Sequence, residues 1–178
     1  GTLPIAVLGL LFREQVENDV RQLWVIGVTL IVFGLLLGLA DFIGKKRRAI
    51  SELGVGSGIA FGLGQALALI PGVSRSGGSI TVGLLLGFTR EAAARYSFLL
   101  AIPAVLAAGT LQFVSSFGDL PQDLLLATIT ATIVSFVSGY AVIAWLLRYL
   151  ERGSFLPFVL WRVMVGSLLL IGLAIGAI

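Results

Sequence analysis

The sequence predicts an all-α integral membrane protein with about four full transmembrane helices, one re-entrant helical hairpin and a partial N-terminal span. Of its 178 residues, 58% are apolar and 12% are charged, whereas soluble domains have roughly 45–50% and about 25%. The mean hydropathy is +1.07, and a water-soluble domain of this length needs more charge to cover its surface. Four apolar runs each approach the ~20 residues that cross a bilayer. We expect a single polytopic membrane domain over residues 1–178.

The chain contains one short apolar segment near its start and four apolar segments long enough to span a membrane. Leu3 to Phe12 is too short to cross a bilayer and follows Gly1 rather than a methionine, so we expect it to be the end of a span whose beginning is missing. Thr89 can cap a helix that carries Glu91 in its first turn. The expected full spans are Leu23 to Ile43, Tyr96 to Val114, Leu124 to Leu147 and Phe155 to Ile178.

The region from about residue 54 to residue 88 does not fit a full span. Gly54 to Pro71 is rich in glycine and carries Gln65, and the apolar run from Ser79 to Phe88 is again short. Two short arms around a polar tip predict a re-entrant hairpin. If each arm crossed the membrane fully, the loops before and after this region would still lie on the same side. Only the shortness of the two arms argues against that alternative. Gly58 and Gly62 have the spacing that lets helix backbones approach closely.

Loop charges favour a hairpin that returns to the side it left, because lysine and arginine collect on the cytoplasmic side of short loops. A single crossing would move about half of the basic residues to the other side. With a returning hairpin, one face holds Lys45, Lys46, Arg47, Arg48, Arg90, Arg95, Arg148 and Arg152. The opposite face has basic residues only between residues 13 and 21, where three acidic residues dilute them.

Composition excludes several kinds of chemistry. The chain has no cysteine and no histidine, which removes disulfides, thiolate nucleophiles, the Ser-His-Asp arrangement and imidazole acids or bases from what these residues can do. The net charge is only +3. The basic residues form short clusters that flank membrane spans, so we expect the bilayer as a partner and no nucleic acid.

The segment Pro71-Gly72-Val73-Ser74-Arg75-Ser76-Gly77-Gly78-Ser79 lies at the tip of the expected hairpin. Non-helical backbone at membrane depth survives only where it is buried in protein or lines a water-filled cavity, so we expect a polar cavity. Arg75 would be a permanent cation there, and its guanidinium matches phosphate oxygens. Bare glycine amides, serine hydroxyls and a helix N-terminus would surround the same point. The segment therefore predicts an anion site, best suited to phosphate.

The alternative for Arg75 is a surface turn at the membrane boundary, with the serines serving as helix caps. Arg162 lies about seven residues into the last span, and we expect it to extend to the interface or to pair with Asp41 or Glu151 rather than to act in catalysis. Trp161 is expected to be an interface anchor.

The segment from Pro71 to Ser79 resembles the second signature of the membrane undecaprenyl-diphosphate phosphatases, also called bacitracin-resistance proteins. That signature is similar to Pro-Gly-x-Ser-Arg-Ser-x-x-Thr, and Ser79 keeps the hydroxyl of its final threonine. The resemblance extends through Tyr96 to Pro103 and through Leu3 to Phe12. It implies a multi-pass enzyme of the bacterial inner (plasma) membrane that removes the terminal phosphate of undecaprenyl diphosphate and recycles this lipid carrier for cell-wall synthesis. It also implies inverted repeats and a divalent cation, Mg²⁺ or Ca²⁺.

The site residues follow from the signature and from the tip chemistry together. We assign catalytic roles to Arg75, Ser74 and Ser79, with Arg75 binding the diphosphate. We assign substrate binding to Ser76, Gly77, Gly78, Gly72 and Gln65.

The first signature of the family, a pair of glutamates followed by Pro-x-Ser-Ser and a histidine, is absent. Gln65 and Leu69 stand where paired glutamates would be, and Gly78 where the histidine would fall. The resemblance therefore implies roughly the C-terminal two-thirds of such an enzyme, with the metal ligands and the nucleophile or base in the missing N-terminal part. A lipid-phosphate transporter or flippase, or an inactive fragment, is the alternative, and homo-oligomerisation is left open.

Overall fold

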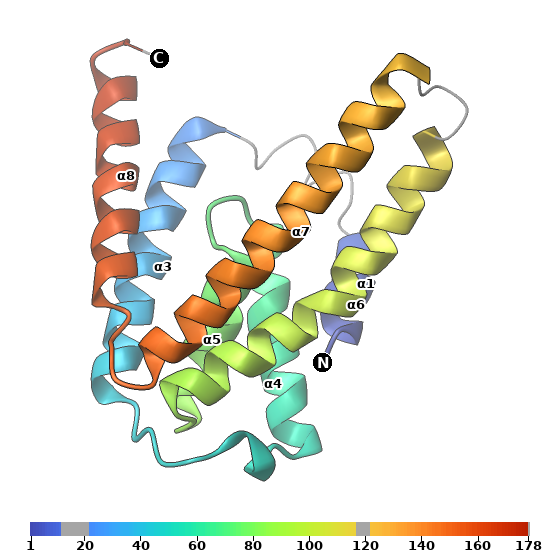
Figure 1. Cartoon of the computed structure of the whole chain (residues 1–178). Helices are drawn as coiled ribbons and strands as arrows, with labels where there is room; N and C mark the ends of the chain where they lie inside the picture. Colours follow the sequence, from blue (N-terminus) through green and yellow to red (C-terminus); the bar gives the residue numbers. More distant parts are fainter. Residues whose placement is uncertain (12–21, 117–121, 178) are drawn as a thin grey trace.

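The structure is a computed structural model that describes residues 1–11, 22–116 and 122–177 (Figure 1). Its regular elements within these ranges are all helical, and four of the helices, α3, α6, α7 and α8, are long and apolar enough to cross a membrane. This confirms the predicted class of all-α membrane protein. The helices are α1 (Leu3–Leu11), α3 (Leu23–Ile43), α4 (Val55–Ala66), α5 (Arg75–Leu85), α6 (Arg90–Ser116), α7 (Gln122–Leu150) and α8 (Leu156–Ala174), with short 3₁₀ turns at Ile50–Glu52 and Leu67–Leu69.

The observed helix ends refine the predicted spans. Helix α3 has the predicted bounds, whereas α6 begins at Arg90 because its first turn is polar and does not register as an apolar run. The predicted cap of α6 is confirmed, since the hydroxyl of Thr89 accepts a hydrogen bond from the Ala92 amide at 3.2 Å. Helix α8 ends at Ala174, ahead of a left-handed Gly176 with φ +67°, a conformation typical of helix C-termini. Phe12, the last residue of the first predicted segment, lies outside the described residues.

Helices α3 and α8 pack side by side over much of their length (Figure 1). Their backbones approach most closely at Gly27 and Gly166, where a Cβ added to Gly166 would lie 2.7 Å from the carbonyl oxygen of Gly27. Without a hydrophobic force between helices in lipid, such close backbone packing is a main source of helix association. The pair α3–α8 therefore forms a tight two-helix wall beside the shorter helices.

Helices α4 and α5 form a helical hairpin packed against α3 and α6. They meet at Gly64 and Gly78, where a Cβ on Gly64 would lie 2.8 Å from the carbonyl oxygen of Gly78. With 12 and 11 residues, the arms are about 18 Å and 17 Å long at about 1.5 Å per residue, well short of the hydrocarbon core of a bilayer. In Figure 1 the turn between them lies part-way along α3 and α8. The depth of this hairpin in the membrane and the inverted repeat stay predictions.

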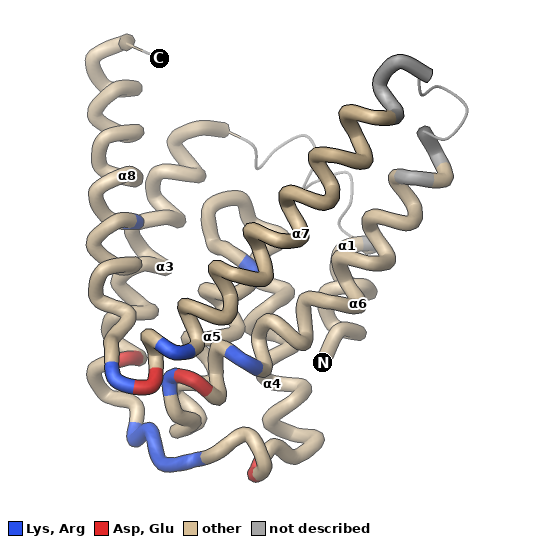
Figure 2. Tube along the Cα trace, viewed as in Figure 1, with Lys and Arg blue, Asp and Glu red and all other residues tan. Residues whose placement is uncertain are grey.

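The buried core lies at the end of the molecule where α3 ends and α6 and α8 begin. Phe61 is fully buried there and packs edge-on against Phe88 and Tyr96, with ring centroids 5.5 Å and 4.8 Å away. Most charged residues of the described part gather at the same end (Figure 2). This arrangement agrees with the shared basic face that the loop charges predict; residues 13–21, which carry the opposing charges, lie outside the described residues.

Candidate functional site

The N-terminus of α5 is built on an unusual backbone. Ser74 is the N-cap of the helix and has φ +70° and ψ 125°, a region that non-glycine residues rarely occupy. Its hydroxyl accepts a hydrogen bond from the Gly77 amide at 3.2 Å and lies 3.4 Å from the hydroxyl of Ser76. The two hydroxyls and the first amides of α5 therefore share one small region, where the helix dipole favours negative charge.

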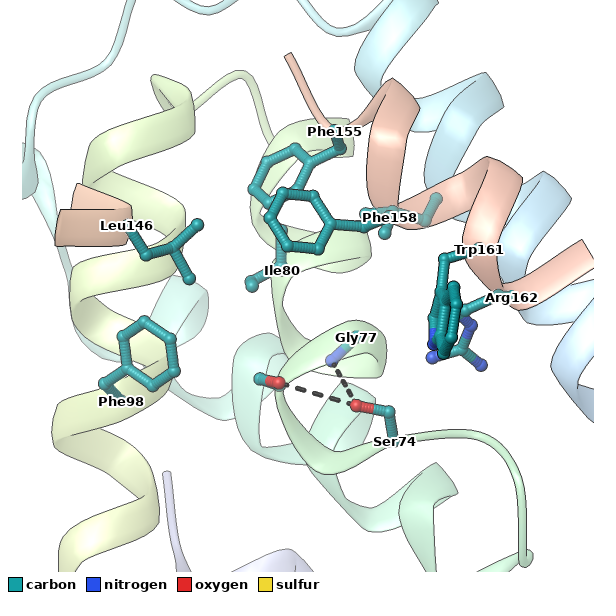
Figure 3. Close-up of a pocket in the computed structure, with 11 residues that line it drawn as sticks. Ser74, Gly77, Ile80, Phe98, Leu146, Phe155, Phe158, Trp161 and Arg162 are labelled. Atoms are coloured by element: carbon teal, nitrogen blue, oxygen red, sulfur yellow. Dashed lines mark hydrogen bonds between the residues drawn. The ribbon is translucent and has the colours of Figure 1, made fainter. Parts of the chain in front are cut away.

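A pocket of about 250 Å³ opens beside this helix start (Figure 3). Its polar side consists of Ser74, Ser76, Gly77 and Arg162. The remaining wall is apolar and comes from α3, α5, α6, α7 and α8. It is formed by Leu37, Ile80, Phe98, Leu146, Phe155, Phe158 and Trp161. The pocket thus has the two-sided character that an amphiphile with an anionic headgroup requires.

Arg162 supplies the cation of this pocket. Its Nη2 donates hydrogen bonds to the carbonyl oxygens of Gly72 and Val73, at 2.7 Å and 3.0 Å. Its Nη1 lies so near the first turn of α5 that a Cβ on Gly77 would be 3.0 Å away, and its Nε is buried without a hydrogen-bond partner among the described residues. A planar guanidinium with N–H groups to spare, set beside a helix N-terminus, is suited to bind phosphate oxygens.

The predicted pairing of Arg162 with Asp41 or Glu151 is wrong. Asp41 is already engaged, because its carboxylate accepts hydrogen bonds from Arg90 at 2.6 Å and 3.2 Å, and the hydrogen bonds of Arg162 run to the hairpin turn instead. The position of Arg162 in the lining of the pocket was therefore not anticipated from the sequence. The available signal was its position as the lone charge in an apolar span, which marks a functional residue by default.

Apart from Gly72, whose carbonyl oxygen accepts a hydrogen bond from Arg162, the predicted site residues fall into three groups. Ser74, Ser76 and Gly77 line the pocket. Arg75 is exposed on the first turn of α5 and is absent from the pocket lining; its guanidinium has no ion pair among the described residues.

Three predicted residues are packed behind the pocket rather than in its lining. Ser79 is fully buried, and its hydroxyl donates to the carbonyl oxygens of Arg75 at 2.9 Å and Ser76 at 3.2 Å. Gly78 is buried against Gly64. Gln65 is also fully buried on α4, and neither atom of its side-chain amide has a hydrogen-bond partner among the described residues. The roles assigned to these residues stay predictions.

The predicted divalent cation finds no ligand set in this pocket. The polar lining offers hydroxyls, amides and a guanidinium but no carboxylate, and Mg²⁺ and Ca²⁺ prefer carboxylate oxygens. Within the described ranges, no three His, Cys, Asp or Glu residues cluster closely enough to hold a metal ion. The described residues therefore do not fit the cation.

Four apolar helices, with a pocket that has a polar and an apolar side beside a hairpin tip, define a polytopic α-helical membrane protein. The family model described as "Bacitracin resistance protein BacA" matches residues 1–168. The chain belongs to this family, and it is a multi-pass protein of the bacterial inner (plasma) membrane.

Curated relatives point to the same family. The undecaprenyl-diphosphatase of Kineococcus radiotolerans is 56% identical over 166 residues, which cover 92% of the chain and 58% of the relative. The undecaprenyl-diphosphatase of a Nocardioides species is 52% identical over 182 residues and the undecaprenyl-diphosphatase 2 of Agrobacterium fabrum 51% over 178, each covering the whole chain. The chain spans 58%, 65% and 64% of the lengths of these three relatives.

Proposed function

We propose that this protein is an undecaprenyl-diphosphate phosphatase, which hydrolyses the lipid diphosphate to undecaprenyl phosphate and inorganic phosphate. The product is the lipid carrier of cell-wall synthesis, and its regeneration would oppose bacitracin. Family membership and the names of the relatives support the substrate. The observation that carries the proposal is the pocket itself, where Arg162 and the start of α5 face an apolar wall.

The two sides of the pocket suit the two parts of such a substrate. The diphosphate would bind at the polar side, between the guanidinium of Arg162 and the hydroxyls of Ser74 and Ser76. The isoprenoid chain would lie against the aromatic wall that includes Phe158 and Phe98. The isoprenoid chain already lies in hydrocarbon when the substrate is in the membrane, so this wall would hold it by close van der Waals packing and leave the polar groups to orient its headgroup.

Phosphoryl transfer depends mostly on positioning and on the stabilisation of charge on the phosphoryl oxygens. Arg162 and the first amides of α5 would stabilise that charge. Arg75 remains in the proposal as a phosphate-binding residue, because it begins α5 and its exposed side chain is free to turn toward the headgroup. Ser79 would have to release the Arg75 carbonyl before it could contact phosphate.

A divalent cation also remains part of the proposal, with ligands other than the described pocket residues, and no step above depends on it. Homo-oligomerisation is left open.

The test is release of inorganic phosphate from undecaprenyl diphosphate by the purified protein in detergent with Mg²⁺, with the Nocardioides relative assayed alongside. We expect phosphate release that saturates with substrate. In proteoliposomes, movement of lipid phosphate between leaflets without phosphate release would instead support a flippase. Failure to release phosphate while the relative is active would contradict the proposal for this chain.

A further inference from the structure

We propose that Thr29 is a positioning residue and that, together with Arg162 of the pocket, it clamps the hairpin turn and so holds Ser74 in the pocket. The clamp matters for catalysis only if the proposed phosphatase function is right, but its geometry can be tested without substrate. It consists of hydrogen bonds from two long helices to three consecutive carbonyl oxygens, those of Pro71, Gly72 and Val73.

The first half of the clamp comes from α3. The Thr29 hydroxyl donates to the carbonyl oxygen of Pro71 at 2.6 Å, across 42 residues of sequence. The same hydroxyl lies 2.8 Å and 3.1 Å from the carbonyl oxygens of Val25 and Ile26 in its own helix. A threonine hydroxyl has one proton, and its shortest contact is with the hairpin rather than with its own helix.

The second half of the clamp comes from α8. One nitrogen of Arg162, Nη2, donates to both Gly72 and Val73, across 90 and 89 residues of sequence. A lysine at this position would keep the charge but lose the planar fork, which allows Nη2 to bind the turn while Nη1 stays beside Gly77. The clamp therefore depends on the geometry of the guanidinium as well as on its charge.

The turn is also pressed against α3. Gly72 has φ +91°, and a Cβ added there would lie 2.9 Å from the carbonyl oxygen of Ile26. The turn thus has α3 on one side and the arginine of α8 on the other. Few other conformations are open to Val73 and the residue that follows it.

Ser74 stands where this held turn meets α5. Its φ of +70° is costly for a non-glycine residue and persists only where the surrounding structure over-determines it. On its C-terminal side, its carbonyl oxygen accepts the Gly78 amide at 3.0 Å. On its N-terminal side, the clamp acts together with the full burial of Val73 and with the hydrogen bond from the Val73 amide to the carbonyl oxygen of Ile70 at 3.2 Å. Loss of the clamp would let Ser74 relax toward negative φ and would move its hydroxyl away from Gly77 and the pocket.

The chain has no cysteine, so a single introduced cysteine reports on this site alone. We would place it with Ser76→Cys, label it with a water-soluble maleimide and with a nitroxide, and combine it with Thr29→Val or Arg162→Lys. Thr132→Val is the matched control, because among the residues that the structure describes the hydroxyl of Thr132 bonds only within α7, at 2.8 Å to the Thr128 carbonyl.

Loss of one hydrogen bond of the clamp should raise the labelling rate about fivefold, with a more mobile nitroxide spectrum. Thr132→Val should leave both unchanged. Thr29→Ser keeps the hydroxyl and should behave as the parent. Labelling rates in Thr29→Val and Arg162→Lys that match the Thr132→Val control would overturn the clamp. Valine has nearly the same shape as threonine, so we expect Thr29→Val to fold. It therefore tests the clamp even if Arg162→Lys does not fold.

Activity of the same substitutions in the protein without Ser76→Cys separates this inference from the proposed function. We expect kcat to fall about tenfold in Thr29→Val while KM changes little, because Thr29 does not line the pocket. If the parent releases no phosphate but labelling responds, the proposed function fails and the clamp stands. If the parent is active but labelling does not respond, the clamp fails and the function stands.

Discussion

The carboxylate of Asp41 accepts a hydrogen bond from the Nε of Arg90 at 2.6 Å, which joins the end of α3 to the beginning of α6. The same carboxylate accepts the backbone amide of Phe155 at 3.1 Å, immediately before α8. Lys46 lies 3.9 Å from it. Asp41 is only 7% exposed, so one nearly buried carboxylate fixes three helix ends that surround the core.

Asp41→Asn should therefore destabilise the protein. The amide keeps the shape but removes the charge opposite Arg90, and we expect a loss of about 1–3 kcal/mol. Thermal unfolding in detergent, followed by tryptophan fluorescence, measures it. The control is Glu91→Gln, which breaks the exposed pair with Arg95 at 2.8 Å and should cost about 0.5 kcal/mol or less. Equal losses in the two variants would show that Asp41 does not have this role.

Gly166→Ala should separate α3 from α8. The new methyl group would meet the Gly27 carbonyl at 2.7 Å, and overpacking of this kind costs about 1–3 kcal/mol. Gly109→Ala on α6 is the control, because within the described residues no atom outside the adjoining turns of α6 lies within 4 Å of a Cβ at that position, and alanine there should be neutral or slightly stabilising. Unfolding midpoints report both, and an unchanged midpoint for Gly166→Ala would contradict the close packing.

Arg75→Ala should abolish most phosphate release and leave stability unchanged. Removal of a group that stabilises transition-state charge costs about 10²–10³ in kcat, whereas an exposed side chain contributes little to folding. Arg148→Ala, at an exposed position in the last turn of α7, is the control and should retain activity. Turnover of Arg75→Ala near that of the parent would remove Arg75 from the site.

Phe158→Ala should weaken binding of the lipid without affecting the headgroup. Loss of the packing contacts between this ring and the isoprenoid chain should raise KM for undecaprenyl diphosphate about fivefold, while the inhibition constant of inorganic diphosphate stays the same. Phe136→Ala is the control, because Phe136 is 73% exposed on α7 and lines no part of the pocket. A parallel rise in both constants would mean that Phe158 acts on the polar side instead.

The long helices could be predicted because a bilayer span needs a continuous apolar run, and α3 has the predicted ends. The hairpin tip could be located because Pro71, Gly72 and the serines interrupt such runs. The partners of Arg162 could not be predicted, because they are backbone carbonyl groups about 90 residues away in the sequence. Every residue has a backbone carbonyl, so the residue types do not indicate which one accepts the hydrogen bond. The orientation of Ser79 was equally hidden, since a serine inside a helix can bond its own backbone or point outward.

Helix α8 packs on α3 where Gly166 meets Gly27, and it carries Arg162 four residues earlier, about one helical turn away. A change in the tilt of α8 would therefore move the guanidinium and the turn that it holds. Bilayers of different thickness impose different tilts on long apolar helices. Headgroup affinity should therefore vary with acyl-chain length of the host lipid, even when the chemistry of the headgroup region is constant.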